Sequence, residues 1–322
     1  MLFLIGFRHC YYTDHDINPN IRIYMSCSLR RTHISNIFYA LTCPLLIAAN
    51  LFSLTTVYAA DANESPIKTS ITSTTLNTKS YTILEQTKHD SNSFTQGFSL
   101  EDGIFYESSG LYKKSYLHKY TQDPSNVNIN TPVNIKTPVN IKIPLDDNLF
   151  AEGLELVGNK LYLLTWRAEQ LLVFNKNTLK QEHVLNYEGE GWGLTHDGKY
   201  FYMSNGSDEI SIRNTHDFSQ KRHIQVHDAQ YAYRNINELE YAKGFIWANI
   251  WQSNLILKIQ PFSGRVVATY DLTPLTRYNS RQPRHSVLNG IAFDETRDAF
   301  WITGKLWPNR YLLQFNDNKP QP

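Results

Sequence analysis

Residues 150–166 read FAEGLELVGNKLYLLTW. Two apolar runs, each long enough for a strand, flank the turn residues Gly158 and Asn159, and this pattern predicts a β-hairpin. Phe150 and Glu152 stand at its front edge, so an acidic side chain lies at the mouth of an otherwise apolar hairpin. The same hairpin recurs along the chain, and its recurrence decides the fold.

The recurring unit has a short strand, a turn with Gly, Asp or Asn, and a second strand rich in Tyr, Phe, Trp or Ile. The five copies are QGFSLEDGIFYESSG from Gln96, EGLELVGNKLYLLTW from Glu152, WGLTHDGKYFYMSNG from Trp192, NELEYAKGFIWANIW from Asn237 and NGIAFDETRDAFWITGK from Asn289. Period-two alternation with little amphipathic helix signal indicates an all-β fold. Small sheets repeated every 40–55 residues or so are typical of propeller blades, and the five copies predict a five-bladed β-propeller over residues 80–322. A β-sandwich is the alternative, but it does not predict five aligned hairpins.

The first 60 residues differ in composition from the rest. A basic stretch, an apolar run and a small-residue exit at Ala59 and Ala60 predict a signal peptide over residues 1–60, with Met25 as an alternative start. We therefore expect an exported protein, periplasmic or secreted, without stable membrane contact after processing. The alternative is a retained membrane anchor, since the apolar run is long enough to span a bilayer. A proline and an asparagine within the run argue against it.

Two further segments interrupt the pattern. Residues 61–79 are rich in Ser and Thr without apolar periodicity and predict a flexible linker. Residues 127–142, VNINTPVNIKTPVNIK, form a tandem repeat that predicts a loop insertion at the surface.

All three cysteines lie in the leader, so we expect no disulfide and no thiolate metal site after cleavage. With 31 basic and 30 acidic residues the chain has no charge excess that indicates nucleic acid. Because propellers close their own sheet edges, a monomer is expected.

Radial symmetry brings equivalent positions of the five copies together around the central channel. The positions just before the innermost strands are Gln96, Glu152, Trp192, Asn237 and Asn289. A second set, after the second strands, consists of Trp166, Trp251 and Lys305, with Ser109 and Gly206 in the other copies. Glu152 is the single acid of its ring. Neutral polar groups and indoles surround it, and this combination predicts a site.

A lone carboxylate beside indole rings is partly desolvated, which raises its pKa toward neutrality and suits it to proton transfer. The amides of Gln96 and Asn237 are candidates to orient a substrate. Lys305 is a candidate to bind a carbonyl oxygen or to steady the charge of the carboxylate. The candidate pocket walls are Phe94, Phe150, Trp166, Trp192 and Trp251. The alternative is that these rings form ordinary propeller core.

Seven motifs carry a family resemblance. They are FTQG (94–97), FAEGLE (150–155), EGWGLT (190–195), NELE (237–240), NIWQ (250–253) and LNGIAFD with TGKLWP (288–294 and 303–308). In this order they resemble the plant-type glutaminyl cyclases, or glutaminyl-peptide cyclotransferases, over roughly residues 81–317. The resemblance implies a five-bladed propeller that converts N-terminal glutaminyl residues of peptides or proteins to pyroglutamate with release of ammonia.

The resemblance also implies roles for the site residues. Glu152 would be the general acid and base, with Lys305 as the second catalytic residue. The implied substrate-binding residues are Phe94, Gln96, Phe150, Trp166, Trp192, Asn237 and Trp251. No cofactor and no catalytic metal are implied, although a structural calcium ion in the channel is compatible with the sequence.

Two other functions stay open at this stage. A calcium-dependent, lactonase-like propeller hydrolase would use oxygen ligands from Gln96, Glu152, Asn237 and Asn289, which are of the type that calcium prefers. Only one of these ligands is charged, which argues against it. A non-catalytic secreted propeller would instead use the aromatic side chains as a binding surface.

Overall fold

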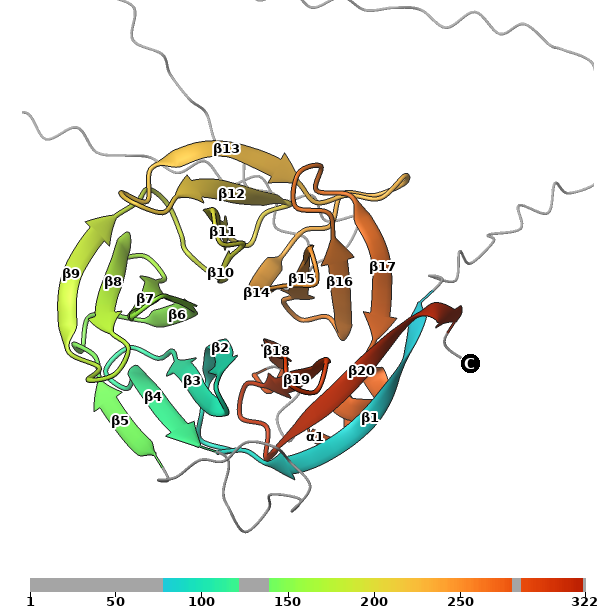
Figure 1. Cartoon of the computed structure of the whole chain (residues 1–322), viewed down its shortest axis with the longest axis horizontal. Coiled ribbons are helices and arrows are strands. Elements are labelled where there is room, and N and C mark those ends of the chain that lie inside the picture. Colours follow the sequence, from blue (N-terminus) through green and yellow to red (C-terminus); the bar gives the residue numbers. More distant parts are fainter. Residues whose placement is uncertain (1–77, 122–138, 280–284, 321–322) are drawn as a thin grey trace, which may run out of the picture. The chain divides into compact units, whose positions relative to one another are not determined.

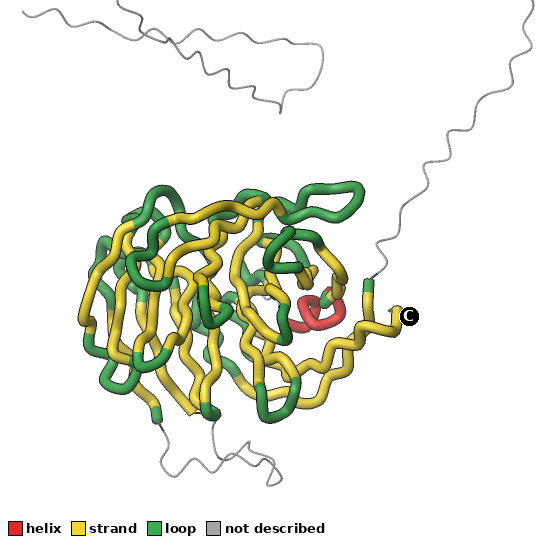
Figure 2. The backbone as a smooth tube through the Cα atoms, turned by 45° about the horizontal axis from the view of Figure 1, so that its top comes forward, coloured by secondary structure: helices red, strands yellow, loops and turns green. Residues whose placement is uncertain are grey.

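Antiparallel strands make up nearly all of the structure (Figure 2). The computed structural model describes residues 78–121, 139–279 and 285–320, which belong to one compact unit. In these ranges the single helix is α1 (Thr273–Asn279), with seven residues. Nothing helical in this part of the chain is long and apolar enough to cross a membrane.

Three four-stranded sheets are each built from consecutive strands that pair antiparallel in chain order. The first contains β2 (Thr95–Glu101), β3 (Ile104–Ser109), β4 (Tyr116–Thr121) and β5 (Asn140–Pro144). The second contains β6 (Ala151–Val157), β7 (Lys160–Thr165), β8 (Gln170–Asn175) and β9 (Gln181–Asn186). The third contains β10 (Leu194–His196), β11 (Tyr200–Ser204), β12 (Glu209–Asn214) and β13 (Gln220–Gln225).

An eight-stranded sheet completes the ring, in the order β14-β15-β16-β17-β1-β20-β19-β18. Its strands are β14 (Ile236–Ala242), β15 (Phe245–Ile250), β16 (Leu255–Ile259), β17 (Val266–Asp271), β18 (Leu288–Asp294), β19 (Ala299–Gly304), β20 (Asn309–Pro320) and β1 (Lys79–Lys88). The two halves meet at one parallel pair, Lys79 with Tyr270, whereas β1 pairs with β20 along most of its length. The first strand of the propeller, β1, thus belongs to the same sheet as the last strand, β20.

The sheets stand around a central channel with β2, β6, β10, β14 and β18 innermost (Figure 1). The predicted β-propeller is confirmed, and the sandwich alternative is wrong. The count of five blades stays a prediction; dividing the eight-stranded sheet at Lys79 and Tyr270 yields five four-stranded units.

Neighbouring sheets pack face to face through apolar side chains. Between the first and second sheets, Tyr106 and Leu117 belong to the same buried cluster as Leu154, Leu163 and Leu172. These side chains alternate along their strands with others that face away, as period-two patterning requires. Burial of each such leucine stabilises the fold by about 2 kcal/mol relative to an exposed one.

The register of four inner strands is irregular near the ring residue. The shifts fall between Thr95 and Gly97 in β2 and between Ala151 and Leu154 in β6, with equivalents in β14 and β18. Such bulges re-aim a side chain. Gly153 allows the neighbouring strand to approach, because a Cβ there would lie 2.6 Å from the backbone nitrogen of Leu194.

Three expectations are corrected in detail. Residues 140–142, within the predicted loop insertion 127–142, belong to β5, because their backbone pairs with β4. Lys79, assigned to the linker, begins β1. Four of the ring residues lie one position inside their strands rather than before them. The leader, residues 61–77 and residues 127–138 lie outside the described residues.

Candidate active site

The inner strands begin at one end of the channel and bring the predicted ring of polar side chains together there. Its four buried members, each second in its strand, are Gln96, Glu152, Asn237 and Asn289. Trp192 lies two residues before β10. Asn289 Nδ2 donates hydrogen bonds to the backbone oxygens of Thr95 at 2.9 Å and Gln96 at 3.1 Å. The last inner strand therefore holds the first one in place at the ring.

Glu152 and Lys305 form the ionisable centre of this end. Glu152 is 5% exposed, and Gln96 Nε2 donates a hydrogen bond to its Oε1 at 3.3 Å. The backbone oxygen of Glu152 accepts a hydrogen bond from the Ser108 hydroxyl, which fixes the start of β6. Lys305 is also 5% exposed, and its Nζ lies 4.9 Å from the centroid of the Phe94 ring.

Burial sets the protonation of both groups. Desolvation raises the pKa of Glu152 well above its ordinary value; the charge of Lys305 opposes this shift and that of Glu190 adds to it. Desolvation lowers the pKa of Lys305 to about 8, although the charge of Glu152 opposes this. A carboxyl group with a raised pKa and an amine with a lowered pKa are suited to exchange protons with a substrate.

Three amide atoms at this end are buried and have no hydrogen-bond partner among the described residues: Gln96 Oε1, Asn289 Oδ1 and Asn249 Nδ2. Asn249 Oδ1 accepts the Gly290 N–H at 3.0 Å, so this amide is held by one atom and free at the other. Buried polar atoms are nearly always paired in folded proteins. Two acceptors and one donor beside the Glu152 ring therefore suit a polar ligand.

Aromatic side chains stand around the centre in two groups. Phe150 and Trp166 have ring centroids 5.4 Å apart, and Trp192 and Trp251 lie perpendicular to each other at 5.8 Å. The structure thus brings the predicted wall residues to this end of the channel. Trp251, at 38% exposed, is the outermost of the four.

Sequence reasoning missed Glu190, which joins the two aromatic groups. Its Oε2 accepts hydrogen bonds from Trp166 Nε1 at 2.8 Å and Trp192 Nε1 at 3.0 Å, and its Oε1 accepts one from Arg167 Nε at 2.9 Å. These bonds outweigh partial burial and lower the pKa of Glu190. The motif EGWGLT contains this acid, but its reach to Trp166 depends on the fold.

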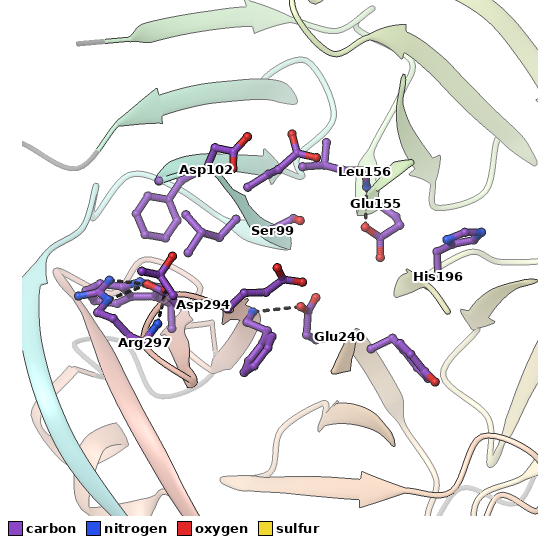
Figure 3. Close-up of a pocket in the computed structure, with 17 residues that line it drawn as sticks. Ser99, Asp102, Glu155, Leu156, His196, Glu240, Asp294 and Arg297 are labelled. Atoms are coloured by element: carbon purple, nitrogen blue, oxygen red, sulfur yellow. Dashed lines mark hydrogen bonds and ion pairs between the residues drawn. The ribbon is translucent and has the colours of Figure 1, made fainter. Parts of the chain in front are cut away.

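A cavity of about 360 Å³ lies at the other end of the channel (Figure 3). Glu155 and Glu240 face it, and burial raises the pKa of Glu155 to about 7 and that of Glu240 well above its ordinary value. Of its two basic lining side chains, His196 and Arg297, the arginine is ion-paired with Asp294 and Glu85. None of the predicted site residues lines it. The predicted combination of a ring carboxylate, a lysine and indoles is found at the opposite end, around Glu152.

Comparison with known proteins identifies the family. A sequence model described as glutamine cyclotransferase matches residues 50–315. The chain belongs to this family. It is 30% identical over 239 residues to the glutaminyl-peptide cyclotransferase of Arabidopsis thaliana, over 72% of this chain and 70% of the relative. The crystal structure of Myxococcus xanthus glutaminyl cyclase is similar, with a TM-score of 0.65, 32% identity, and coverage of 75% of this chain and 99% of that one. The family resemblance read from the motifs is confirmed, and the chain is an enzyme of the glutamine cyclotransferase family.

In this glutamine cyclotransferase, a buried network supports the two segments that carry Phe94, Gln96 and Lys305. Glu107 accepts hydrogen bonds from Thr95 Oγ1 at 2.6 Å, Tyr120 Oη at 3.0 Å and the Ser93 hydroxyl, and pairs with His89 Nε2 at 3.1 Å. His89 Nδ1 in turn hydrogen-bonds the backbone oxygen of Trp307 at 2.8 Å. The network therefore joins the segment before β2 to the segment after β19.

Burial acts to raise the pKa of Glu107, but the charge and hydrogen bond of His89, with the bonds from Ser93 and Thr95, lower it to about 2. Because the folded pKa lies below the ordinary 4.5, the ionised Glu107 stabilises the fold above pH 4.5, and this stabilisation is lost as the pH falls through about 2.

The free energy of unfolding of the wild type should therefore exceed that of Glu107→Gln by about 3 kcal/mol at pH 6, and the difference should shrink below pH 4.5. Urea unfolding at several pH values measures it, and a difference independent of pH between 6 and 3 would contradict the assignment.

Proposed function

We propose that the chain is a glutaminyl-peptide cyclotransferase that converts N-terminal glutaminyl residues of peptides and proteins to pyroglutamate and releases ammonia. The observation that carries the proposal is the buried Glu152, hydrogen-bonded to Gln96, near Lys305 and within an aromatic wall. Membership of the glutamine cyclotransferase family supports the same reaction.

In the proposed mechanism Glu152 moves one proton. The neutral α-amino nitrogen of the substrate attacks its own γ-carbonyl carbon, and a carbon–nitrogen bond forms that closes a five-membered ring. The Glu152 carboxylate accepts a proton from the attacking nitrogen and delivers it to the side-chain amide nitrogen. The bond from the carbonyl carbon to that nitrogen then breaks, ammonia leaves, and Glu152 returns to its ionised form.

Lys305 and the ring amides have supporting roles in this scheme. The Lys305 ammonium group stabilises negative charge on the γ-carbonyl oxygen as the tetrahedral intermediate forms. Gln96, Asn237 and Asn289 orient the amine and the amide of the substrate. Since both reacting groups belong to one residue, a compact pocket that holds them in contact provides much of the acceleration. Phe94, Phe150, Trp166, Trp192 and Trp251 enclose the substrate and exclude water.

We further propose that catalysis needs no metal ion and no cofactor, and that the enzyme is an exported monomer, periplasmic or secreted. A lysine whose charge acts on Glu152, the single acid of the ring, disfavours a bound cation at that point. Among the described residues, no group of three or more His, Cys, Asp or Glu side chains is arranged to hold a metal ion.

The test is ammonia release from the dipeptide Gln-Ala by the purified protein, with and without EDTA. We expect equal rates in both, and no ammonia from Gly-Gln, whose glutamine has no free α-amine. Loss of activity in EDTA with recovery in calcium would overturn the metal-independent mechanism in favour of a calcium site. No ammonia from a folded protein would overturn the cyclotransferase function and favour a binding module.

A further inference from the structure

We infer that Tyr112, Phe150 and Trp166 form a subsite for the side chain of the second residue of the substrate, and that the enzyme therefore prefers peptides with an aromatic residue after the N-terminal glutamine. The inference rests on the proposed function and specifies the substrates of the same site. These three residues are named the aromatic shelf.

The three rings of the aromatic shelf contact one another. The Tyr112 and Phe150 centroids lie 5.4 Å apart, the Phe150 and Trp166 centroids 5.4 Å apart, and the Tyr112 and Trp166 centroids 6.3 Å apart. Phe150 and Trp166 are partly buried, whereas Tyr112 is 46% exposed, so Tyr112 is the solvent-facing member of the aromatic shelf. A large aromatic ring at the surface, continuous with a wall of the site, is suited to contact a ligand.

Hydrogen bonds and close packing fix the segment that contains Tyr112. Ser115 Oγ accepts the N–H of Ala151 at 3.1 Å and that of Leu111 at 3.0 Å, and so ties the segment after β3 to the start of β6. Gly110 lies so close to Phe150 that a Cβ would be 2.3 Å from the ring. Because the segment is already fixed, little ordering is needed when a substrate binds.

The position of the aromatic shelf fits the path of the peptide. The α-amine and the γ-amide of the first residue must face Glu152, so the main chain has to leave toward solvent. Phe150 is two residues before Glu152, and consecutive Cα atoms of a peptide lie about 3.8 Å apart. The inferred path takes the side chain of the second residue past Phe150 and Trp166, and a large side chain on to Tyr112.

The chemistry of the rim favours an aromatic side chain. The Arg167 guanidinium group stacks on Trp166 at 3.9 Å and is ion-paired with Glu190 at 2.9 Å, so its charge is already balanced. Aromatic rings gain from stacked or edge-to-face contact beyond the area that they bury. Trp251, the other exposed ring of the site, is paired among the described residues with one ring, Trp192, whereas Tyr112 contacts two.

The test compares kcat/KM for Gln-Phe-Ala and Gln-Ala-Ala. For the wild type we expect a ratio of about ten in favour of Gln-Phe-Ala, expressed mainly in KM. In Tyr112→Ser the ratio should fall to about two, whereas Tyr112→Phe, which keeps the ring, should retain it. Phe262→Ser is the matched control: Phe262 is 69% exposed in the turn between β16 and β17, which belong to a different sheet from β3, and its removal should leave the ratio unchanged.

A wild-type ratio near one, or an equal ratio in wild type and Tyr112→Ser, would overturn the subsite. A ratio that falls in Trp251→Ser and not in Tyr112→Ser would overturn it too, because the second residue would then lie over β15. If the proposed function itself is wrong, the wild type will release ammonia from neither peptide, and this result differs from every outcome that overturns only the subsite.

Discussion

Replacement of Glu152 by glutamine is expected to lower kcat for Gln-Ala by about a thousandfold, since general acid–base catalysis contributes about 10²–10⁴ in rate. The amide has nearly the shape of the carboxyl group but cannot carry the proton from the attacking amine to the departing ammonia. Substrate binding through the aromatic walls and the ring amides should remain, so KM should change little. Steady-state ammonia release gives both parameters.

The fold should tolerate this change, because a neutral amide avoids the cost of a buried charge. The matched control is Glu155→Gln, on the same strand β6 but lining the cavity at the other end of the channel. We expect its kcat to stay within about threefold of wild type, because Glu155 takes no part in the proposed reaction and its replacement removes no interaction with the transition state. Equal losses in the two variants, or a Glu152→Gln enzyme that is fully active, would remove Glu152 from the mechanism.

Local patterns were sufficient to predict the hairpins and the ring. Each copy has its own turn residues, and period-two alternation is a property of a few neighbouring side chains. Once the copies are aligned, symmetry relates Gln96 to Glu152 without any knowledge of distances. The hydrogen bond between these two side chains, 56 positions apart, is a consequence of that alignment.

Features that depend on sheet closure or on side-chain reach were not predictable in this way. The pairing of β1 with β20 joins the two ends of the propeller, and no local signal in residues 79–88 indicates it. Glu190 contacts an indole 24 positions away, and Glu107 acts through His89 on a segment near residue 307. The register shifts beside the ring residues arise from pairing between strands, so the sequence alone placed Gln96, Glu152, Asn237 and Asn289 before their strands, whereas each is the second residue of its strand.

The second large effect is expected at Lys305. In Lys305→Met we expect kcat/KM for Gln-Ala to fall by about a hundredfold near pH 7, the size of effect seen when one stabilising donor to an oxyanion is removed. Methionine keeps the length and the apolar part of the side chain and removes the charge. Lys258→Met is the matched control, since Lys258 is also buried but pairs with Asp317 outside the site. Its activity should stay within about threefold of wild type.

The pH dependence separates a cation at the oxyanion from a residue that only packs. Lys305 has a pKa of about 8 and acts as an ammonium group, so the wild type loses this contribution as the pH rises through about 8, whereas the variant has none to lose. Removing Lys305 also removes the charge that opposes the raised pKa of Glu152, so the variant needs a higher pH to ionise its carboxylate. Titration of the substrate amine is common to both enzymes and cancels in the ratio of their kcat/KM values. Both effects have the same sign: the ratio of wild type to Lys305→Met should decrease steadily from pH 6 to pH 9. A ratio that is constant over this range would show that Lys305 supports the pocket only by packing.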